Sequence, residues 1–362
     1  MVKLITRLEL AHDDRKLIDL IANEDWKQLR TALKEQKDEL TQIDKRRGWT
    51  VLHYMCAIPS IPDDIFATAV RLYPIATSVQ GTSPYCHLPL HVFCGAQDHS
   101  FCKVQVLLEH MRPDDLLVTS YTRGSLLHHA YRKQVRLSIL QELIRANPKI
   151  VLLRHHFQLT PLHAEQYGLL QVRYLLRGIK VDERRFQEYW AKVVLIATAA
   201  FKLSTNYDPA SSIEGNIEDY TLHGLQFLHA PHSIQHAATI LHPKWASIPD
   251  SQGNYPLHNA ILDIPPKNIF LPPFVKEILE AFPEAVMKRN TEGESPIFVA
   301  MRKGMTWEKG IKDIVRTHPE SLYSTDHQTG LFPFLLAASL NQEANMETSY
   351  QLLCSNPSLL KT

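Results

Sequence analysis

A short motif recurs along the chain, and it constrains the fold more than any other feature of the sequence. It reads Thr-Pro-Leu-His at residues 160–163, Tyr-Pro-Leu-His at 255–258 and Leu-Pro-Leu-His at 88–91. Looser copies keep part of the motif, and successive copies lie 35 to 40 residues apart except for one gap of 60. A fixed period of this length is typical of repeat proteins. The histidine, or the residue that replaces it, serves as the anchor of each repeat: His53, His91, His128, His163, His223, His258, Phe298 and Leu335.

A second mark, an apolar stretch that runs into a proline, confirms the register of the repeats. Val104, Leu107 and Leu108 show the i, i+3, i+4 spacing of a helix face, and Pro113 follows them. Proline lacks a backbone N–H and restricts the residue before it, so it predicts where the helix ends. The distance from this proline to the next anchor is 15 to 17 residues where both are present. Each repeat therefore predicts two helices, the first opening with Thr or Ser as N-cap and proline at the first helical position.

These repeats resemble ankyrin repeats, whose signature runs Gly-x-Thr-Pro-Leu-His-x-Ala. Residues 253–260 and 158–164 match it best, and Gly48, Gly293 and Gly330 stand five residues before their anchors. The family's turn needs a glycine that tolerates positive φ at that position. The period exceeds the family's value of about 33 residues, and proline replaces the usual Gly-Ala pair after the second helix. The turn glycine is replaced in three repeats, whose turns we expect to differ, by Cys86, Arg123 and Gln158.

The resemblance implies an all-α, ankyrin-like helical repeat solenoid of about eight helix-turn-helix units with an N-terminal capping helix pair. We expect the capping helices in residues 1–40, repeats one to four in 41–182, an inserted helix and loop in 183–218, and repeats five to eight in 219–362. The insertion has apolar residues at helical spacing, which predicts an amphipathic helix packed on the array. A lid over a bound partner is the alternative for this segment. The residues that carry the spacing are Phe186, Tyr189, Trp190, Val193, Val194 and Ala197.

A group of cysteines and histidines in the second repeat has the composition of a zinc site. However, His91 is a repeat anchor, and Cys94 follows it by three residues as Cys56 follows His53. A position repeated in this way is expected to be buried, and the anchor histidines of ankyrin-like repeats hydrogen-bond to the neighbouring turn. We therefore expect no metal and no cofactor. The residues of the group are Cys86, His87, His91, Cys94, His99 and Cys102.

Several functional classes find no support in the sequence. There is no nucleophile elbow, phosphate-binding loop, dinucleotide fingerprint or zinc-protease motif, and the chain has only 13 glycines. The 39 Lys and Arg residues balance 38 Asp and Glu residues, so no nucleic-acid partner is expected. No run of eighteen apolar residues is present, so no membrane segment is expected. The five cysteines and the lack of an N-glycosylation sequon favour an intracellular protein, cytoplasmic or nuclear, and we expect a monomer.

Binding of another protein remains as the predicted function. We expect a non-enzymatic scaffold that contacts its partner, an acidic segment, through the turn tips and the ends of the first helices. The alternatives are a signalling or ubiquitin-pathway adaptor, or an enzyme with a site in the 183–218 insertion. For Trp49 and Phe157, wedging between turns is an equal alternative to partner contact. The predicted partner-binding residues are Arg46, Arg47, Trp49, Tyr85, Tyr121, Thr122, Arg132, Lys133, His156, Phe157 and Tyr167.

Overall fold

The computed structural model describes ten stretches of the chain, and they are almost entirely helical. These stretches are residues 16–44, 47–82, 87–96, 100–120, 124–154, 159–163, 166–206, 216–265, 271–340 and 343–357. Within them the extended structure is one antiparallel pair of short strands, β1 (Thr119–Ser120) and β2 (Gly124–Ser125). The prediction of an all-α fold is confirmed. None of the described helices has the combination of length and apolar character required to cross a lipid bilayer.

The chain divides into two compact units, which we describe separately. The N-terminal unit comprises Met1–Leu170 and Asp182–Leu195, and the C-terminal unit comprises Gln171–Val181 and Ile196–Thr362. The division therefore passes through two helices, α11 (Gln166–Leu176) and α12 (Glu183–Ser204).

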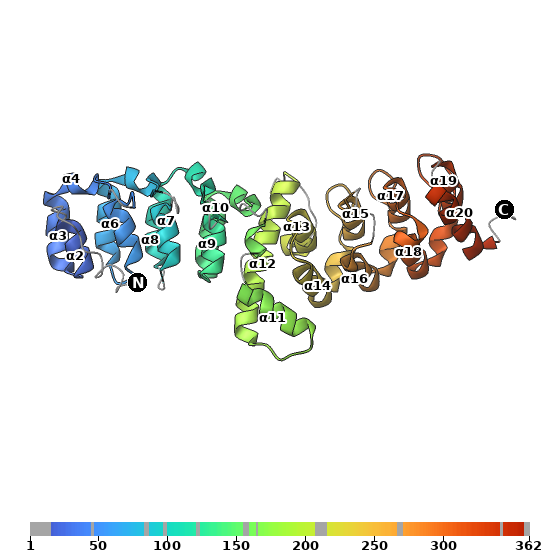
Figure 1. The fold of residues 1–362 in the computed structure, drawn as a ribbon, viewed down its shortest axis with the longest axis horizontal. Helices are drawn as coiled ribbons and strands as arrows, with labels where there is room; N and C mark the ends of the chain where they lie inside the picture. The colour runs from blue at the N-terminus through green and yellow to red at the C-terminus, as the bar shows by residue number, and fades with distance from the viewer. Residues whose placement is uncertain are drawn as a thin grey trace. The chain divides into compact units, whose positions relative to one another are not determined.

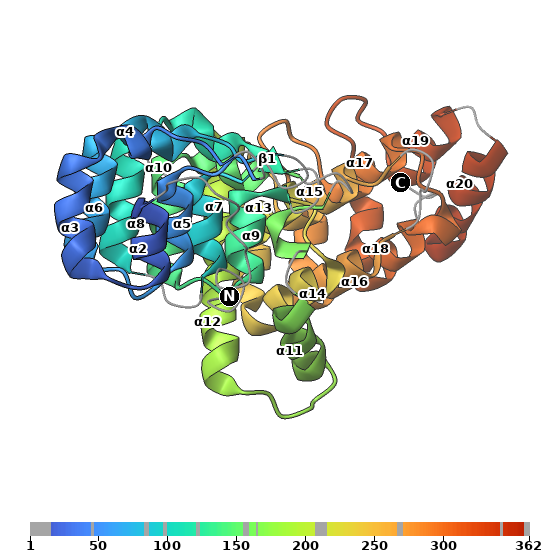
Figure 2. The ribbon, with the colours of Figure 1, turned by 60° about the vertical axis from the view of Figure 1, so that its left-hand side comes forward.

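The N-terminal unit is built from helix pairs, each packed against the pair before it (Figure 2). The first helices form one row, in which α2, α5, α7 and α9 contact each other in turn, and α3, α6, α8 and α10 form the second row. The pairs are α2 (Lys16–Ala22) with α3 (Trp26–Glu35) and the short α4 (Lys37–Leu40), α5 (Val51–Ala57) with α6 (Asp63–Leu72), α7 (Pro89–Gly95) with α8 (Phe101–His110), α9 (Leu126–Arg132) with α10 (Leu137–Ala146), and the 3-10 turn η4 (Pro161–His163) followed by α11.

The C-terminal unit repeats this arrangement (Figure 1). Helices α13, α15, α17 and α19 form one row of neighbours, and α14, α16 and α18 form the other. After the 3-10 turn η5 (Ile217–Tyr220), the pairs are α13 (Thr221–Phe227) with α14 (His232–Leu241), α15 (Pro256–Leu262) with α16 (Pro273–Ala281), α17 (Pro296–Arg302) with η8 (Trp307–Lys309) and α18 (Ile311–Thr317), and α19 (Pro333–Ser339) with α20 (Glu343–Ser355).

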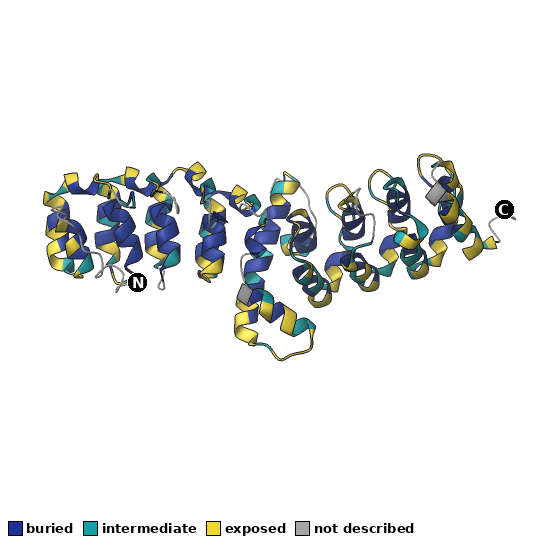
Figure 3. Ribbon diagram, in the orientation of Figure 1, coloured by how far each residue is buried: buried dark blue, intermediate teal, exposed yellow. Residues whose placement is uncertain are grey.

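The predicted helix ends are confirmed, and so are the helix starts. The second helices α6, α10, α14, α16 and α18 all end two residues before the predicted proline, and α8 ends three residues before Pro113. Thr50, Ser125 and Ser295 occupy N-cap positions, and proline stands at the first position of α7, α15, α17 and α19. Figure 3 shows that the first helices are buried over most of their surface, whereas the second helices expose one side. The apolar face of each helix is therefore covered by its neighbours.

The proline at the end of each second helix has a second role that explains the long period. It opens a five-residue 3-10 turn, because its fixed φ suits the first position of a helix. Each turn buries its third and fourth residues against the array, for example Ile150 and Val151. The extra length relative to an ankyrin repeat thus adds packed structure. The turns are η1 (Pro74–Ser78), η2 (Pro113–Leu117), η3 (Pro148–Leu152), η6 (Pro243–Ser247), η7 (Pro283–Met287) and η9 (Pro319–Tyr323).

Helix α12, the predicted insertion helix, is packed along its length. Its apolar side chains, including Phe186, Trp190 and Val193, are buried, although Val194 is half-buried. Two glycines allow this close approach: Gly168 faces the Tyr189 ring, and Gly224 of α13 faces the carbonyl of Ala197. The polar loop that we predicted after this helix lies mostly in residues 207–215, outside the described residues.

Replacing Gly224 by alanine tests this docking of α12 on α13. The new Cβ would lie 1.9 Å from the carbonyl oxygen of Ala197, so the helices must move apart. We expect Gly224→Ala to lower the free energy of unfolding by about 1–3 kcal/mol, measured by urea denaturation. Helix propensity alone favours alanine over glycine by about 1 kcal/mol. An increase in stability would therefore contradict the packing described here.

Candidate interaction surface

Four of the turns that connect one repeat to the next, which we call tips, are closed by an aspartate or asparagine. Asp250 Oδ1 accepts the backbone N–H groups of Gln252 and Asn254, at 2.9 Å each. Asn290 Oδ1 accepts those of Glu292 and Glu294 in the next repeat. Asp44 and Asp326 start equivalent turns. Such side-chain bonds to the following backbone rigidify a turn, and they hold each tip in a defined shape.

The predicted turn glycines adopt the left-handed conformation that the tips need. Gly48, Gly253, Gly293 and Gly330 have φ between 65° and 80°. In the third repeat, where Arg123 stands at the glycine position, Gly124 takes this role one residue later with φ of 79°. That turn therefore differs from the others, and it carries the strand pair β1–β2.

Most anchor histidines join a first helix to the next tip, but in α7 the Nε2 of His91 has no hydrogen-bond partner among the described residues. In α5 the Nδ1 of His53 accepts the backbone N–H of Thr50 at 3.1 Å. This leaves the proton on Nε2, which donates to the carbonyl of His87 at 3.0 Å. His128 and His258 make the same pair of bonds, reaching the carbonyls of Leu159 and Glu294. The predicted structural role is confirmed for these three residues.

Burial favours the neutral form of the imidazoles of His53, His223 and His258. His53 has no exposed surface, and burial lowers its pKa to about 4. Burial also lowers the pKa of His223 and His258, against the opposing effect of their bonds to backbone carbonyls. A neutral ring with fixed donor and acceptor nitrogens is what the two bonds require.

The tip of the first repeat brings together two predicted partner-binding residues. The guanidinium of Arg47 lies over the Trp49 ring, 5.0 Å from its centroid, and the ring also stacks on His53. Gly81 of the next tip faces the Trp49 ring, and the N–H of Thr82 donates to the carbonyl of Arg47. Trp49 is therefore a half-buried wedge between two tips, as the alternative prediction held, whereas Arg47 remains partly exposed above it.

Two further predicted residues lie at the end of a first helix. Arg132 and Lys133 are exposed at the C-terminal end of α9, and they point a basic pair into solvent. The side chain of Tyr167, on α11, is outside the described residues. The other predicted contacts also lie outside them, namely Arg46, Tyr85, Tyr121, Thr122, His156 and Phe157.

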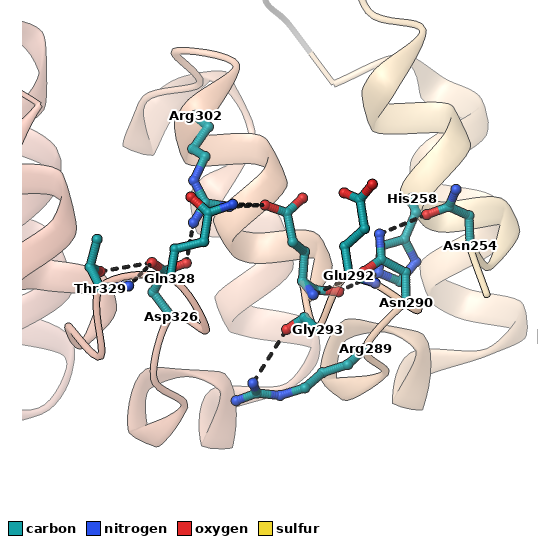
Figure 4. A network of polar contacts seen from close by, with 11 residues as sticks. Asn254, His258, Arg289, Asn290, Glu292, Gly293, Arg302, Asp326, Gln328 and Thr329 are labelled. Atoms are coloured by element: carbon teal, nitrogen blue, oxygen red, sulfur yellow. Dashed lines mark hydrogen bonds and ion pairs between the residues drawn. The ribbon is translucent and has the colours of Figure 1, made fainter. Parts of the chain in front are cut away.

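The tips of the C-terminal unit are connected by a polar network (Figure 4). Arg302, at the end of α17, forms ion pairs with Glu294 of its own tip and Asp326 of the next. The amide of Asn290 donates to Asn254 of the preceding tip at 2.9 Å. Lys303 donates to the carbonyl of Ile264 at 3.3 Å. These basic helix ends therefore bind neighbouring repeats. Their role becomes clear only when the structure shows which acidic groups they pair with.

The predicted burial of the repeated cysteine position, Cys56 in the first repeat and Cys94 in the second, is confirmed. Cys94 and Cys56 are both buried, and burial raises the pKa of each thiol. His91 is also buried, with its ring 5.6 Å from that of His87. Within the described residues no three His, Cys, Asp or Glu side chains are arranged to hold a metal ion. Cys86 and His99 lie outside those residues, and Cys102 is exposed.

Comparison with known proteins identifies no relative: neither a family model nor a curated protein matches the sequence.

Proposed function

We propose that the chain is an ankyrin-type repeat scaffold that binds another protein, inside the cell, through its turn tips and first-helix ends. The observation that supports this most is the rigidity of the tips. The four tips at Asp44, Asp250, Asn290 and Asp326 are closed by these side chains, and histidines or polar side chains join tips to their neighbours. A surface that is rigid before binding loses little conformational entropy when a partner docks.

The partner surface that we propose lies on the N-terminal unit and is basic. Arg47 is held over Trp49, and Arg132 and Lys133 are exposed at the end of α9. Arginine next to an aromatic ring is typical of interface hot spots. A carboxylate-bearing segment matches this chemistry because arginine binds carboxylates through paired hydrogen bonds.

A photo-crosslinking amino acid placed at Arg132 tests this proposal. We expect a partner in cell extract to cross-link efficiently from position 132, and the cross-linked peptide to be rich in acidic residues. Position 145 is the matched control, since Arg145 is also an exposed arginine of the third repeat but lies on the second helix α10.

Charge reversal gives an independent measurement with the same pair of positions. Arg132→Glu should weaken capture of the cross-linked partner by about tenfold, the effect of one charged hydrogen bond, whereas Arg145→Glu should leave capture unchanged. Cross-linking that is stronger from position 145, or equal loss with both variants, would show that the partner binds elsewhere.

A further inference from the structure

One segment of the C-terminal unit, Gln171–Val181, carries three cations and no acid. It comprises the C-terminal part of α11 and the loop that follows this helix. Arg173, Arg177 and Lys180 are exposed, and none of their side chains has a hydrogen bond or ion pair among the described residues. Figures 1 and 2 show this end of α11 and its loop standing clear of the helix rows of the C-terminal unit. The three charges are therefore available to a partner.

Two large apolar side chains are exposed in the same segment. Tyr174 is 39% exposed and Ile179 is 48% exposed, whereas Val172 of the same helix is fully buried. A single exposed apolar residue is common on a protein surface. Exposed apolar side chains that are grouped together and rimmed by charge mark a contact site, so the relative position of Tyr174 and Ile179 matters.

The backbone at the end of α11 brings these two residues together. The N–H of Ile179 donates to the carbonyl of Tyr174 at 2.8 Å, and the N–H of Gly178 donates to that of Leu175 at 2.9 Å. This pair of bonds defines a Schellman motif, in which the chain after the glycine folds back onto the last turn of the helix. Gly178 permits the reversal with a φ of 68°. The end of α11 is therefore a defined turn with an apolar centre, and the three cations flank that centre along the sequence.

The acids that follow along the chain have partners of their own. Asp182 pairs with Arg185 at 3.3 Å, and the Glu183 carboxylate accepts a hydrogen bond from the Gln187 amide at 2.9 Å. Arg184 next to them is exposed. Residues 171–185 thus carry five cations and two acids, a local excess that the balanced charge of the whole chain conceals.

A lipid bilayer fits this projecting surface better than a folded protein does. A specific protein interface draws about 20–30 residues from each side, more than the segment supplies. A bilayer takes up single apolar side chains at the level of its headgroups, where tyrosine is enriched, while arginine and lysine keep their charges in water. On an anionic bilayer each such cation raises the affinity by about fivefold.

We propose that the end of α11 and its loop bind the surface of an anionic membrane. The side chains of Tyr174 and Ile179 enter the headgroup region, and Arg173, Arg177 and Lys180 contact the anionic headgroups. A contact this small is reversible. It uses other residues than the partner surface proposed for the N-terminal unit, and it goes beyond the proposed function.

Co-sedimentation of the full chain with lipid vesicles tests the proposal. We expect the chain to sediment with phosphatidylcholine vesicles that contain about one third phosphatidylserine, and to remain in solution with phosphatidylcholine alone. Binding should fall steeply between about 0.05 M and about 0.5 M salt, because exposed charges are screened. No binding to the anionic vesicles, or equal binding to both kinds of vesicle, would overturn the proposal.

Matched variants locate the binding. Ile179→Ser removes the apolar centre and should weaken vesicle binding by about tenfold, and Arg177→Gln should weaken it by about fivefold. Arg177→Lys keeps the charge and should bind as the unchanged chain does. The controls are Ile240→Ser on α14 and Arg316→Gln on α18, exposed residues of the same unit, and they should have no effect. Unchanged binding in Ile179→Ser and Arg177→Gln, or equal losses in the controls, would overturn the proposal.

An acidic protein segment is the other class of partner that these cations could bind. Retention on polyglutamate beads separates the two classes. We expect Arg177→Gln to weaken vesicle binding and to leave retention on polyglutamate unchanged. The opposite result, loss of retention without loss of vesicle binding, would assign this surface to an acidic protein segment and overturn the proposal.

Discussion

Leu257→Ala should lower the free energy of unfolding of the C-terminal unit by about 2–5 kcal/mol. Leu257 has no exposed surface and lies on α15, which packs against α13, α16 and α17. Truncation loses the free energy gained by burying the leucine side chain. It also leaves a cavity that the surrounding helices can fill only in part. Urea denaturation measures the loss. Amide exchange should accelerate in α15 and in its neighbours α13, α16 and α17, because each repeat in such a stack is stabilised by the adjacent ones.

Leu262→Ala is the matched control for this prediction. It makes the same chemical change on the same helix, but Leu262 is 41% exposed. We expect it to lower stability by less than about 1 kcal/mol. A loss below about 0.5 kcal/mol for Leu257→Ala, or equal losses for the two variants, would show that the repeat register described here is wrong.

Acid should destabilise the protein between pH 7 and pH 5, through its buried anchor histidines. The pKa values of His53, His91, His223 and His258 are all lowered in the folded state by burial. The unfolded chain therefore binds more protons than the folded one in this range. Their contribution to stability is fully present above about pH 6.5 and is lost as pH falls toward their folded values.

The expected size follows from the shift at His53. With a folded pKa of about 4, this residue alone should lower the free energy of unfolding by about 2 kcal/mol between pH 7 and pH 5. The other three histidines act in the same direction. Urea denaturation at a series of pH values measures the sum.

His53→Gln separates the contribution of this one residue. Glutamine at the same position can still accept the backbone N–H of Thr50, as in a capping box, but it does not titrate. The slope of stability against pH should fall by nearly one proton near pH 5.5. Stability that is flat between pH 7 and pH 5, or an unchanged slope in the variant, would contradict the neutral, doubly bonded state of His53.

Much of the secondary structure could be predicted from the sequence because the signals are local and repeated. Pro148 ends a helix because it has no N–H, and Gly253 marks a tip because only glycine tolerates its φ without strain. Neither effect depends on distant residues. The anchor histidine was predictable for a related reason: His258 bonds to a residue one repeat away, and the period places that residue at a constant offset.

Two further patterns of the same kind recur along the sequence. Asp44, Asp250, Asn290 and Asp326 stand eight or nine residues before their anchors, where they close the tips. The second and third residues after each proline, such as Ile150 and Val151, are buried in the 3-10 turns. Both patterns recur with the period, so the sequence alone contained them.

The tertiary structure was needed wherever a side chain contacts a residue that does not stand at a constant distance from it along the sequence. Arg302 stands at the end of a first helix, where we expected partner contacts, but its charge is paired with acids of two tips. Trp49 resembled a hot spot, but the neighbouring tip covers one side of its ring. By itself the sequence determined the period, the helix ends and the tips, because these depend on backbone conformation within one repeat. Only the folded chain decided which charges are satisfied and which remain open to a partner, because that depends on side chains brought together from different repeats.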